Sequence, residues 1–152
     1  MVDRCDSYAE AEQADFISHP RFYFFDNGVR NALVDSYELS PERKGFVFEH
    51  FLYNQIKNSL LAKNIKGKIQ FFRTRSGLEV DFIVTIGSSV WAIEAKAGKV
   101  NDEDLKPLKS FSELAGRKIQ CVAVGLNEAV ARKTKGILIC DWRTLLKEMG
   151  LC

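Results

Sequence analysis

Two neighbouring segments, 78–86 and 90–96, constrain the fold of this chain more than any other feature. In each segment, residues suited to one face of a sheet occupy every second position, which is the pattern of a β-strand. The Gly87-Ser88 pair between them suits a two-residue hairpin turn, which would pair Ile86 with Ser89. The sequence therefore predicts an antiparallel hairpin in a defined register. One face of its first strand is expected to hold Leu78, Val80, Phe82, Val84 and Ile86.

In this register, acidic side chains meet on adjacent strands. Asp81 would lie directly opposite Glu94, and Glu79 opposite Lys96. Like charges in directly opposed positions destabilise a sheet unless another group offsets them, and a hard divalent cation would do so. We therefore expect Mg²⁺ or Mn²⁺ between Asp81 and Glu94. Glu79 is expected to be either a further metal ligand or, as we favour, the salt-bridge partner of Lys96.

The composition of the chain is that of one folded domain. It has 152 residues, of which 46% are hydrophobic, so a single substantial core can form. The formal net charge is only +2, but the first residues are acidic and the rest of the chain is moderately basic. Residues 1–19 are expected to be an acidic tail or the remnant of a preceding element, with a short helix over 6–17. Residues 20–152 are expected to form the domain.

Several classes of site are disfavoured by what the sequence lacks. The four cysteines and two histidines show no metal-ligand spacing, which argues against a zinc site. No Walker-type Gly-rich loop is present, so ATP binding within this chain is not expected. We find no basic leader and no apolar run long enough to cross a membrane, which predicts a reduced, cytoplasmic protein without a membrane partner.

The long helix predicted over 41–62 carries an acid in its apolar stripe. Ser40 and Pro41 are typical of a helix start, and Glu49 projects into the middle of the face expected to be buried, near Phe46. Burying a carboxylate costs several kcal/mol unless it is paired or coordinated. Glu49 is therefore either held by a salt bridge or hydrogen bond to a neighbouring element, or part of a site. His50 is expected at the surface or at the boundary of the core.

The remaining pattern predicts an α/β fold with a central mixed sheet. A short strand, one or two helical turns and the long helix precede three consecutive strands, and a helix and a strand follow them. A final strand and helix close the chain. The expected ranges are 21–25, 28–34, 41–62, 68–75, 78–86, 90–96, 102–115, 118–124, 137–140 and 142–149.

This order of elements, with Asp81 and Glu94-Ala95-Lys96 on adjacent strands, resembles the PD-(D/E)XK nuclease and resolvase superfamily. More narrowly, four segments look like the nuclease-like C-terminal domain of uncharacterised function found in many prokaryotic AAA-type ATPases. The resemblance implies a restriction-endonuclease-like αβββαβ core with an added C-terminal β-α. It also implies an AAA-type ATPase as a partner in cis or in trans. The four segments are FYFFDNGVRNAL, FVFEHFLYNQI, RTRSGLEVDFIV and WAIEAK.

The resemblance also implies a role for each site residue. Asp81 and Glu94 match the Mg²⁺ ligands of the superfamily, and Lys96 matches the lysine that positions or activates the attacking water. Glu49, on the first long helix, matches the glutamate that often completes the site. Val80 stands where the motif name has proline, a common departure.

The expected activity is metal-dependent hydrolysis of phosphodiester bonds in nucleic acid, with DNA as the expected substrate of an endonuclease or resolvase-like enzyme. Carboxylate-held Mg²⁺ supplies both charge neutralisation and an activated water, and a lysine beside it can stabilise developing charge. The alternative is a non-catalytic nuclease-like module that binds nucleic acid or protein and serves an AAA-type ATPase.

Basic residues near the hairpin are expected to contact phosphates, which would make binding weaken with salt. The faces of Arg73 and Arg75 depend on the length of the loop over 74–77. A two-residue loop would place Phe72 opposite Asp81, and a longer loop would change this. The expected phosphate contacts are Arg73, Arg75, Lys99, Lys106 and Lys109.

Overall fold

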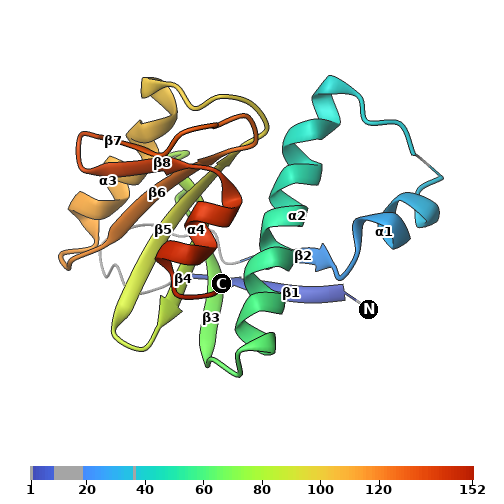
Figure 1. Ribbon diagram of the computed structural model, residues 1–152, viewed down its shortest axis with the longest axis horizontal. Helices are drawn as coiled ribbons and strands as arrows, with labels where there is room; N and C mark the ends of the chain where they lie inside the picture. The colour runs from blue at the N-terminus through green and yellow to red at the C-terminus, as the bar shows by residue number, and fades with distance from the viewer. Residues whose placement is uncertain (1, 9–18, 36) are drawn as a thin grey trace.

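An eight-stranded mixed sheet runs through the computed structural model, which describes residues 2–8, 19–35 and 37–152 (Figure 1). The strands lie in the order β2-β1-β3-β4-β5-β6-β8-β7. The predicted α/β class with a mixed sheet is confirmed. The strands are β1 (Val2–Ser7), β2 (Arg21–Phe24), β3 (Gly67–Arg73), β4 (Glu79–Ile86), β5 (Ser89–Lys96), β6 (Gln120–Gly125), β7 (Arg132–Thr134) and β8 (Ile137–Cys140).

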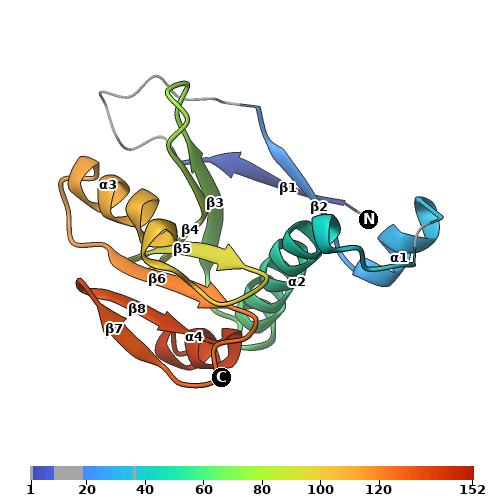
Figure 2. The same cartoon turned by 90° about the horizontal axis from the view of Figure 1, so that it is seen from above.

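Helices cover both faces of the sheet (Figure 2). One core lies under α2 and α4 and includes Phe82, Ile93 and Leu145, whereas the other lies under α3 and includes Ile83 and Phe111. None of the helices within the described ranges is long and apolar enough to cross a membrane. The helices are α1 (Asn27–Leu33), α2 (Pro41–Ala62), the 3-10 turn η1 (Asp102–Leu105), α3 (Lys106–Leu114) and α4 (Trp142–Glu148).

The β4–β5 hairpin has the predicted register. Ile86 pairs with Ser89, and the ladder continues without a shift to Phe82 and Ile93. On β5 the side chains alternate between the two faces of the sheet as predicted. Ala92 packs in the core under α3, and Ile93 packs in the core under α2. Beyond Phe82 and Ile93, the last pair of the ladder, the next residues of the two strands are Asp81 and Glu94.

A β-bulge at Asp81 corrects the predicted face of β4. Gln70 of β3 pairs with Ile83, but Phe72 pairs with Val80, so β4 has one extra residue in this interval. The extra residue inverts the alternation. Val80 therefore packs under α3, together with Leu78, instead of sharing a face with Phe82.

The N-terminal segment belongs to the sheet. Residues 2–7, expected within a tail, form β1, which pairs antiparallel with β2 and parallel with β3. Asp6 and Ser7 are thus extended and not helical, and the rest of the helix predicted over 6–17 falls mainly on residues 9–18, outside the described ranges. β2 is tied to α2, because the Asn54 side chain donates to the Phe24 carbonyl at 3.0 Å.

Helix α2 begins at Pro41 and ends at Ala62, as predicted. Two predictions about its faces were wrong: Phe46 is 44% exposed, and His50 is only 2% exposed. Tyr23 of β2 covers His50, and the centroids of the two rings lie 4.7 Å apart. Burial lowers the pKa of His50 to about 4, so the neutral ring is the stable form.

The C-terminal half follows the predicted order with two differences. The helix expected over 102–115 starts as η1 and becomes α3 only at Lys106, because Pro107 is accommodated in the first turn of an α-helix. The loop expected between β6 and β8 contains a further strand, β7, which pairs antiparallel with β8. Asp141 caps α4 as predicted, accepting from the backbone N–H of Arg143 at 2.8 Å.

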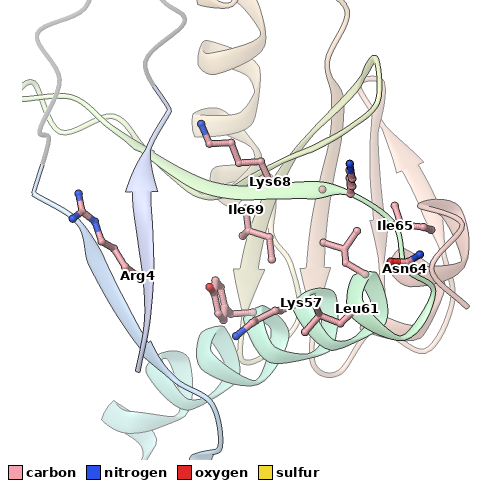
Figure 3. Close-up of a pocket in the computed structure, with 11 residues that line it drawn as sticks. Arg4, Lys57, Leu61, Asn64, Ile65, Lys68 and Ile69 are labelled. Carbon is pink, nitrogen blue, oxygen red and sulfur yellow. The ribbon is translucent and has the colours of Figure 1, made fainter. Parts of the chain in front are cut away.

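A cavity of about 530 Å³ opens where β1 separates from β3 (Figure 3). β1 pairs with β3 only at Gln70 and Phe71, so Gly67–Ile69 line a slit above the C-terminal half of α2. Figure 3 shows Ile69 pointing toward α2 and Lys68 pointing to the other side of the strand. The carboxylates of the hairpin do not line this cavity.

The burial of His50 predicts acid sensitivity. Its pKa is lower in the folded chain than the ordinary 6.5, so its stabilising contribution is complete above pH 6.5 and is lost as the pH falls toward 4. Between pH 7 and pH 5 the wild type should lose about 1–2 kcal/mol more unfolding free energy than His50→Phe, measured by urea unfolding. His19→Gln, which changes the exposed second histidine, should behave like the wild type. If His50→Phe lost as much unfolding free energy between pH 7 and pH 5 as the wild type does, the acid sensitivity would not come from His50.

Candidate functional site

Charged side chains from β2, α2, β4 and β5 come together where β4 and β5 stop pairing. β2 contributes Arg21 and α2 contributes Glu49, on the side of the sheet that α2 covers. β5 contributes Glu94 and Lys96, on the side that α3 covers. Asp81 of β4 lies between these two groups: it is 4.0 Å from the Arg21 guanidinium, and the charge of Glu94 acts on it.

Asp81 is held by the backbone of β5. Its Oδ2 accepts a hydrogen bond from the Ala95 N–H at 2.9 Å, beyond the last residue pair of the ladder. Its side chain is 15% exposed. Burial raises the pKa of Asp81 to about 8, with further contributions from the charges of Glu94 and Glu49. In a metal-free protein near neutral pH, this carboxyl group therefore retains its proton much of the time.

Glu94 is the most buried acid of the site. The residue is 7% exposed, and its Oε1 bonds to the Lys96 ammonium at 2.9 Å. Among the described residues its Oε2 has no hydrogen-bond partner. Burial raises the pKa of Glu94, and Lys96 opposes this shift only in part. A buried carboxylate oxygen without a partner is costly, so a further cationic or donor group is expected beside it.

Lys96 is held by two acids. Besides Glu94, it lies 3.6 Å from Oδ1 of Asp104, in η1. Asp104 is itself fixed, because its Oδ2 accepts from the Asn101 N–H at 2.8 Å. Burial alone would lower the pKa of Lys96, but Glu94 and Asp104 raise it, so the ammonium is charged.

Arg21 forms a second cationic centre that sequence reasoning missed. Its guanidinium bonds to Glu49 at 3.1 Å and also to Glu79. The Tyr23 hydroxyl donates to the same oxygen of Glu49. Burial alone would lower the pKa of Arg21. Tyr23, Glu49 and Glu79 raise this pKa by more than burial lowers it, so the guanidinium keeps its charge. Glu49 therefore forms a salt bridge to a neighbouring element, which was one of its two predicted alternatives, and the same guanidinium lies 4.0 Å from Asp81.

Glu79 does not pair with Lys96, so that prediction was wrong. It pairs with Arg21 and with Arg73, whose Nε lies 3.3 Å from Glu79 Oε2. The cause is the turn after β3, in which Thr74 N–H bonds to the Leu78 carbonyl at 2.8 Å across a three-residue loop. The longer loop places Arg73 opposite Glu79. Arg73 is thereby assigned to the carboxylate side, and Phe72 faces Val80 instead of Asp81.

The other predicted phosphate contacts are spread over the surface. Lys106 and Lys109 are exposed on α3 and pair with Glu103 and Glu113, respectively. Lys99 is exposed beside a cavity of about 410 Å³ next to Glu128. Arg75 is exposed in the loop after β3. Arg73, in contrast, forms an ion pair with a site acid, Glu79.

The donor set suits one hard cation shared with a substrate. Within the described ranges, no three His, Cys, Asp or Glu side chains already form a metal cage. Mg²⁺, however, is commonly bound through one or two carboxylates, with water and substrate phosphates as its other ligands. Glu94, whose Oε2 has no hydrogen-bond partner in the part of the chain that the structure describes, and Asp81, once it has released its proton to the cation, would be two such carboxylates. Glu79 and Glu49, in contrast, are already paired with Arg21.

Three residues that contact the predicted site residues were not recognised from the sequence as part of the site. Arg21 and Tyr23 stand in a short aromatic strand, and Asp104 reads as an ordinary first-turn acid of a helix. Tyr23 stacks on Tyr53 of α2 with ring centroids 4.2 Å apart, and this contact fixes β2 against the helix that carries Glu49. The alternation of Arg21 and Tyr23 on one side of a strand facing an acid-bearing helix was the available signal.

The chain belongs to the family described as a domain of unknown function, DUF4143, whose model matches residues 44–145. The matched range runs from α2 into α4 and contains Glu49, Asp81, Glu94 and Lys96. It leaves out β2 and hence Arg21. No curated protein matches the chain.

The raised pKa of Asp81 predicts a pH-dependent cost of folding. The folded chain binds this proton more tightly than the unfolded chain does, so stability falls as the pH rises from about 4 to about 8. In EDTA at pH 8, Asp81→Asn should be more stable relative to the wild type than it is at pH 4, by about 1–3 kcal/mol in urea unfolding. Asp102→Asn, at an exposed acid, should show no such change. If Asp81→Asn kept the pH dependence of the wild type, the pH-dependent cost of folding would not come from Asp81.

Proposed function

We propose that this domain hydrolyses phosphodiester bonds in nucleic acid, DNA being the expected substrate, with Mg²⁺ or Mn²⁺ bound by Asp81 and Glu94. The observation that carries the proposal is the buried Glu94 side chain, whose Oε2 has no partner among the described residues and whose charge acts on Asp81. Two buried carboxylates in such a position are costly without a cation. Carboxyl groups whose pKa is shifted by burial and by a neighbouring charge cluster at functional sites.

Each side chain has a role that follows from its contacts. Bound Mg²⁺ would neutralise the attacked phosphate and make a water nucleophilic at neutral pH. Lys96 is charged and held by Glu94 and Asp104, so it can position that water or stabilise charge that develops on the phosphate. Glu49 acts through Arg21, since its Oε1 already accepts two hydrogen bonds. Arg73, at the rim, can contact a neighbouring phosphate.

The arrangement of elements supports a restriction-endonuclease-like core. The order α2-β3-β4-β5-α3-β6 corresponds to the αβββαβ order of the PD-(D/E)XK superfamily, and β8-α4 is the added C-terminal pair. The carboxylates and the lysine lie on β4 and β5, the strands that carry the motif. The glutamate of the first long helix reaches the same site.

A second candidate function is a non-catalytic module that binds nucleic acid or protein and serves an AAA-type ATPase in cis or in trans. The observation that favours it is Arg21, which already offsets the charge of Glu49 and Glu79 without any metal. Calorimetric titration with Mg²⁺ separates the two candidates. Binding that Asp81→Asn abolishes supports the enzyme, and no binding supports the module.

The proposed chemistry predicts Mg²⁺- or Mn²⁺-dependent nicking of supercoiled or branched DNA by the purified protein. Asp81→Ala should remove the metal ligand and Lys96→Ala the cation beside the water, so each should lower the rate at least ~100-fold. Agarose-gel assays with and without EDTA measure this directly.

Two exposed residues provide matched controls for these variants. Asp102→Ala and Lys147→Ala remove the same kinds of charge outside the site and should cleave at the wild-type rate. If the wild type, Asp81→Ala and Lys96→Ala were equally inert across DNA and RNA substrates and both metals, the enzyme proposal would fail.

A further inference from the structure

Arg21 occupies a position in the site that is otherwise enclosed by carboxylates. Its guanidinium lies within 4.0 Å of an oxygen of Glu49, Glu79 and Asp81. The central carbon of the guanidinium, Cζ, lies 4.7 Å from the ring centroid of Phe71, and this ring covers one face of the group. Because one flat face is closed by an aromatic ring, the group meets its acids through its edge, where its five N–H donors lie.

The position of Arg21 is built into the fold. The residue pairs with Cys5 in the β1–β2 ladder, and its side chain is only 21% exposed. The Tyr23 hydroxyl shares Glu49 Oε1 with it, and Tyr23 is itself stacked on α2. Arg21 is therefore a fixed charge of the site, unlike the exposed lysines of α3.

The remaining negative charge lies on the other side of Asp81. Glu94 has one oxygen on Lys96 and one oxygen without a partner among the described residues. With every group ionised, as cation binding requires of Asp81, the five carboxylates and three basic groups of the site carry a formal charge of −2, which one divalent cation would neutralise. These groups are Glu49, Glu79, Asp81, Glu94 and Asp104, with Arg21, Arg73 and Lys96.

We infer that the site takes one divalent cation, on the Asp81–Glu94 side, and that the Arg21 guanidinium permanently fills the place of a second cation on the Glu49–Glu79 side. In two-cation sites the ions lie about 3.5–4 Å apart, a spacing that a carboxylate between them can bridge. Here Asp81 is the shared acid, and a covalently attached cation replaces one of the two ions. The inference rests on the proposed function only for the class of ligand, a hard divalent cation.

The experiment counts Mn²⁺ ions bound to the full chain, from the free-Mn²⁺ signal in electron paramagnetic resonance at an excess of Mn²⁺. The wild type should bind one ion per chain. Arg21→Gln should bind two, because removal of the guanidinium leaves Glu49, Glu79 and Asp81 facing one another. Arg21→Gln combined with Glu49→Gln should return to one. Arg4→Gln is the matched control, since Arg4 lies on the neighbouring strand and pairs with Asp6 outside the site, and it should bind one ion.

Two ions bound to the wild type, or one ion bound to a folded Arg21→Gln variant, would overturn the inference. Circular dichroism establishes whether the variant is folded. Should Arg21→Gln not fold, the wild-type count alone decides: one ion supports the inference and two ions contradict it.

Failure of the proposed function would look different. One ion in the wild type and two in Arg21→Gln, without cleavage of any nucleic acid, would uphold the cation count and refute the nuclease. Cleavage by a wild type that binds two ions would uphold the nuclease and refute the cation count. A wild type that binds no Mn²⁺ would refute both.

Discussion

The site depends on one hydrogen bond, from the backbone N–H of Ala95 to the carboxylate of Asp81. The β4–β5 ladder ends at Phe82 and Ile93, and the bulge in β4 adds one residue at this point. The side chain of Asp81 bonds to the strand beyond the ladder, so β4 and β5 stay joined while apolar side chains give way to acids. Bulges commonly re-aim a side chain in this way beside functional sites.

The electrostatic consequence is a divided site. On the side covered by α2, Arg21 offsets Glu49 and Glu79, and the packing of Tyr23 on Tyr53 keeps β2 in place to hold it. On the side covered by α3, Lys96 offsets only part of the charge of Glu94. The shortage of positive charge is therefore confined to Asp81 and Glu94, where a cation has most to contribute.

Local patterns predicted the parts of the fold that local interactions determine. Gly87-Ser88 set the hairpin register, and Ser40-Pro41 marked the start of α2. The hairpin register predicted that Asp81, Glu94 and Lys96 lie near one another, whereas the place of Glu49 beside them was implied only by the resemblance to the nuclease superfamily. The bulge at Asp81 was missed because the sequence of β4 alternates regularly, whereas the extra residue appears only in the pairing with β3 and moves Val80 to the other face.

Long-range contacts explain the remaining errors. His50 was expected at the surface or at the boundary of the core because its own helix shows no reason for burial, and Tyr23 of β2 covers it. Arg21 reaches the site only because β2 pairs with β1 and β1 with β3, across a large separation in sequence. Glu79 was assigned to Lys96 from strand parity alone, whereas the three-residue loop after β3 brings Arg73 to it.

Anomalous diffraction from crystals grown with Mn²⁺ would locate the cation between Asp81 and Glu94. The account predicts a single peak at coordination distance, about 2–2.6 Å, from carboxylate oxygens of both Asp81 and Glu94. Arg21 should remain paired with Glu49 in the same crystal. The absence of a peak between Asp81 and Glu94, or a peak in the place of a displaced Arg21 side chain, would contradict the account.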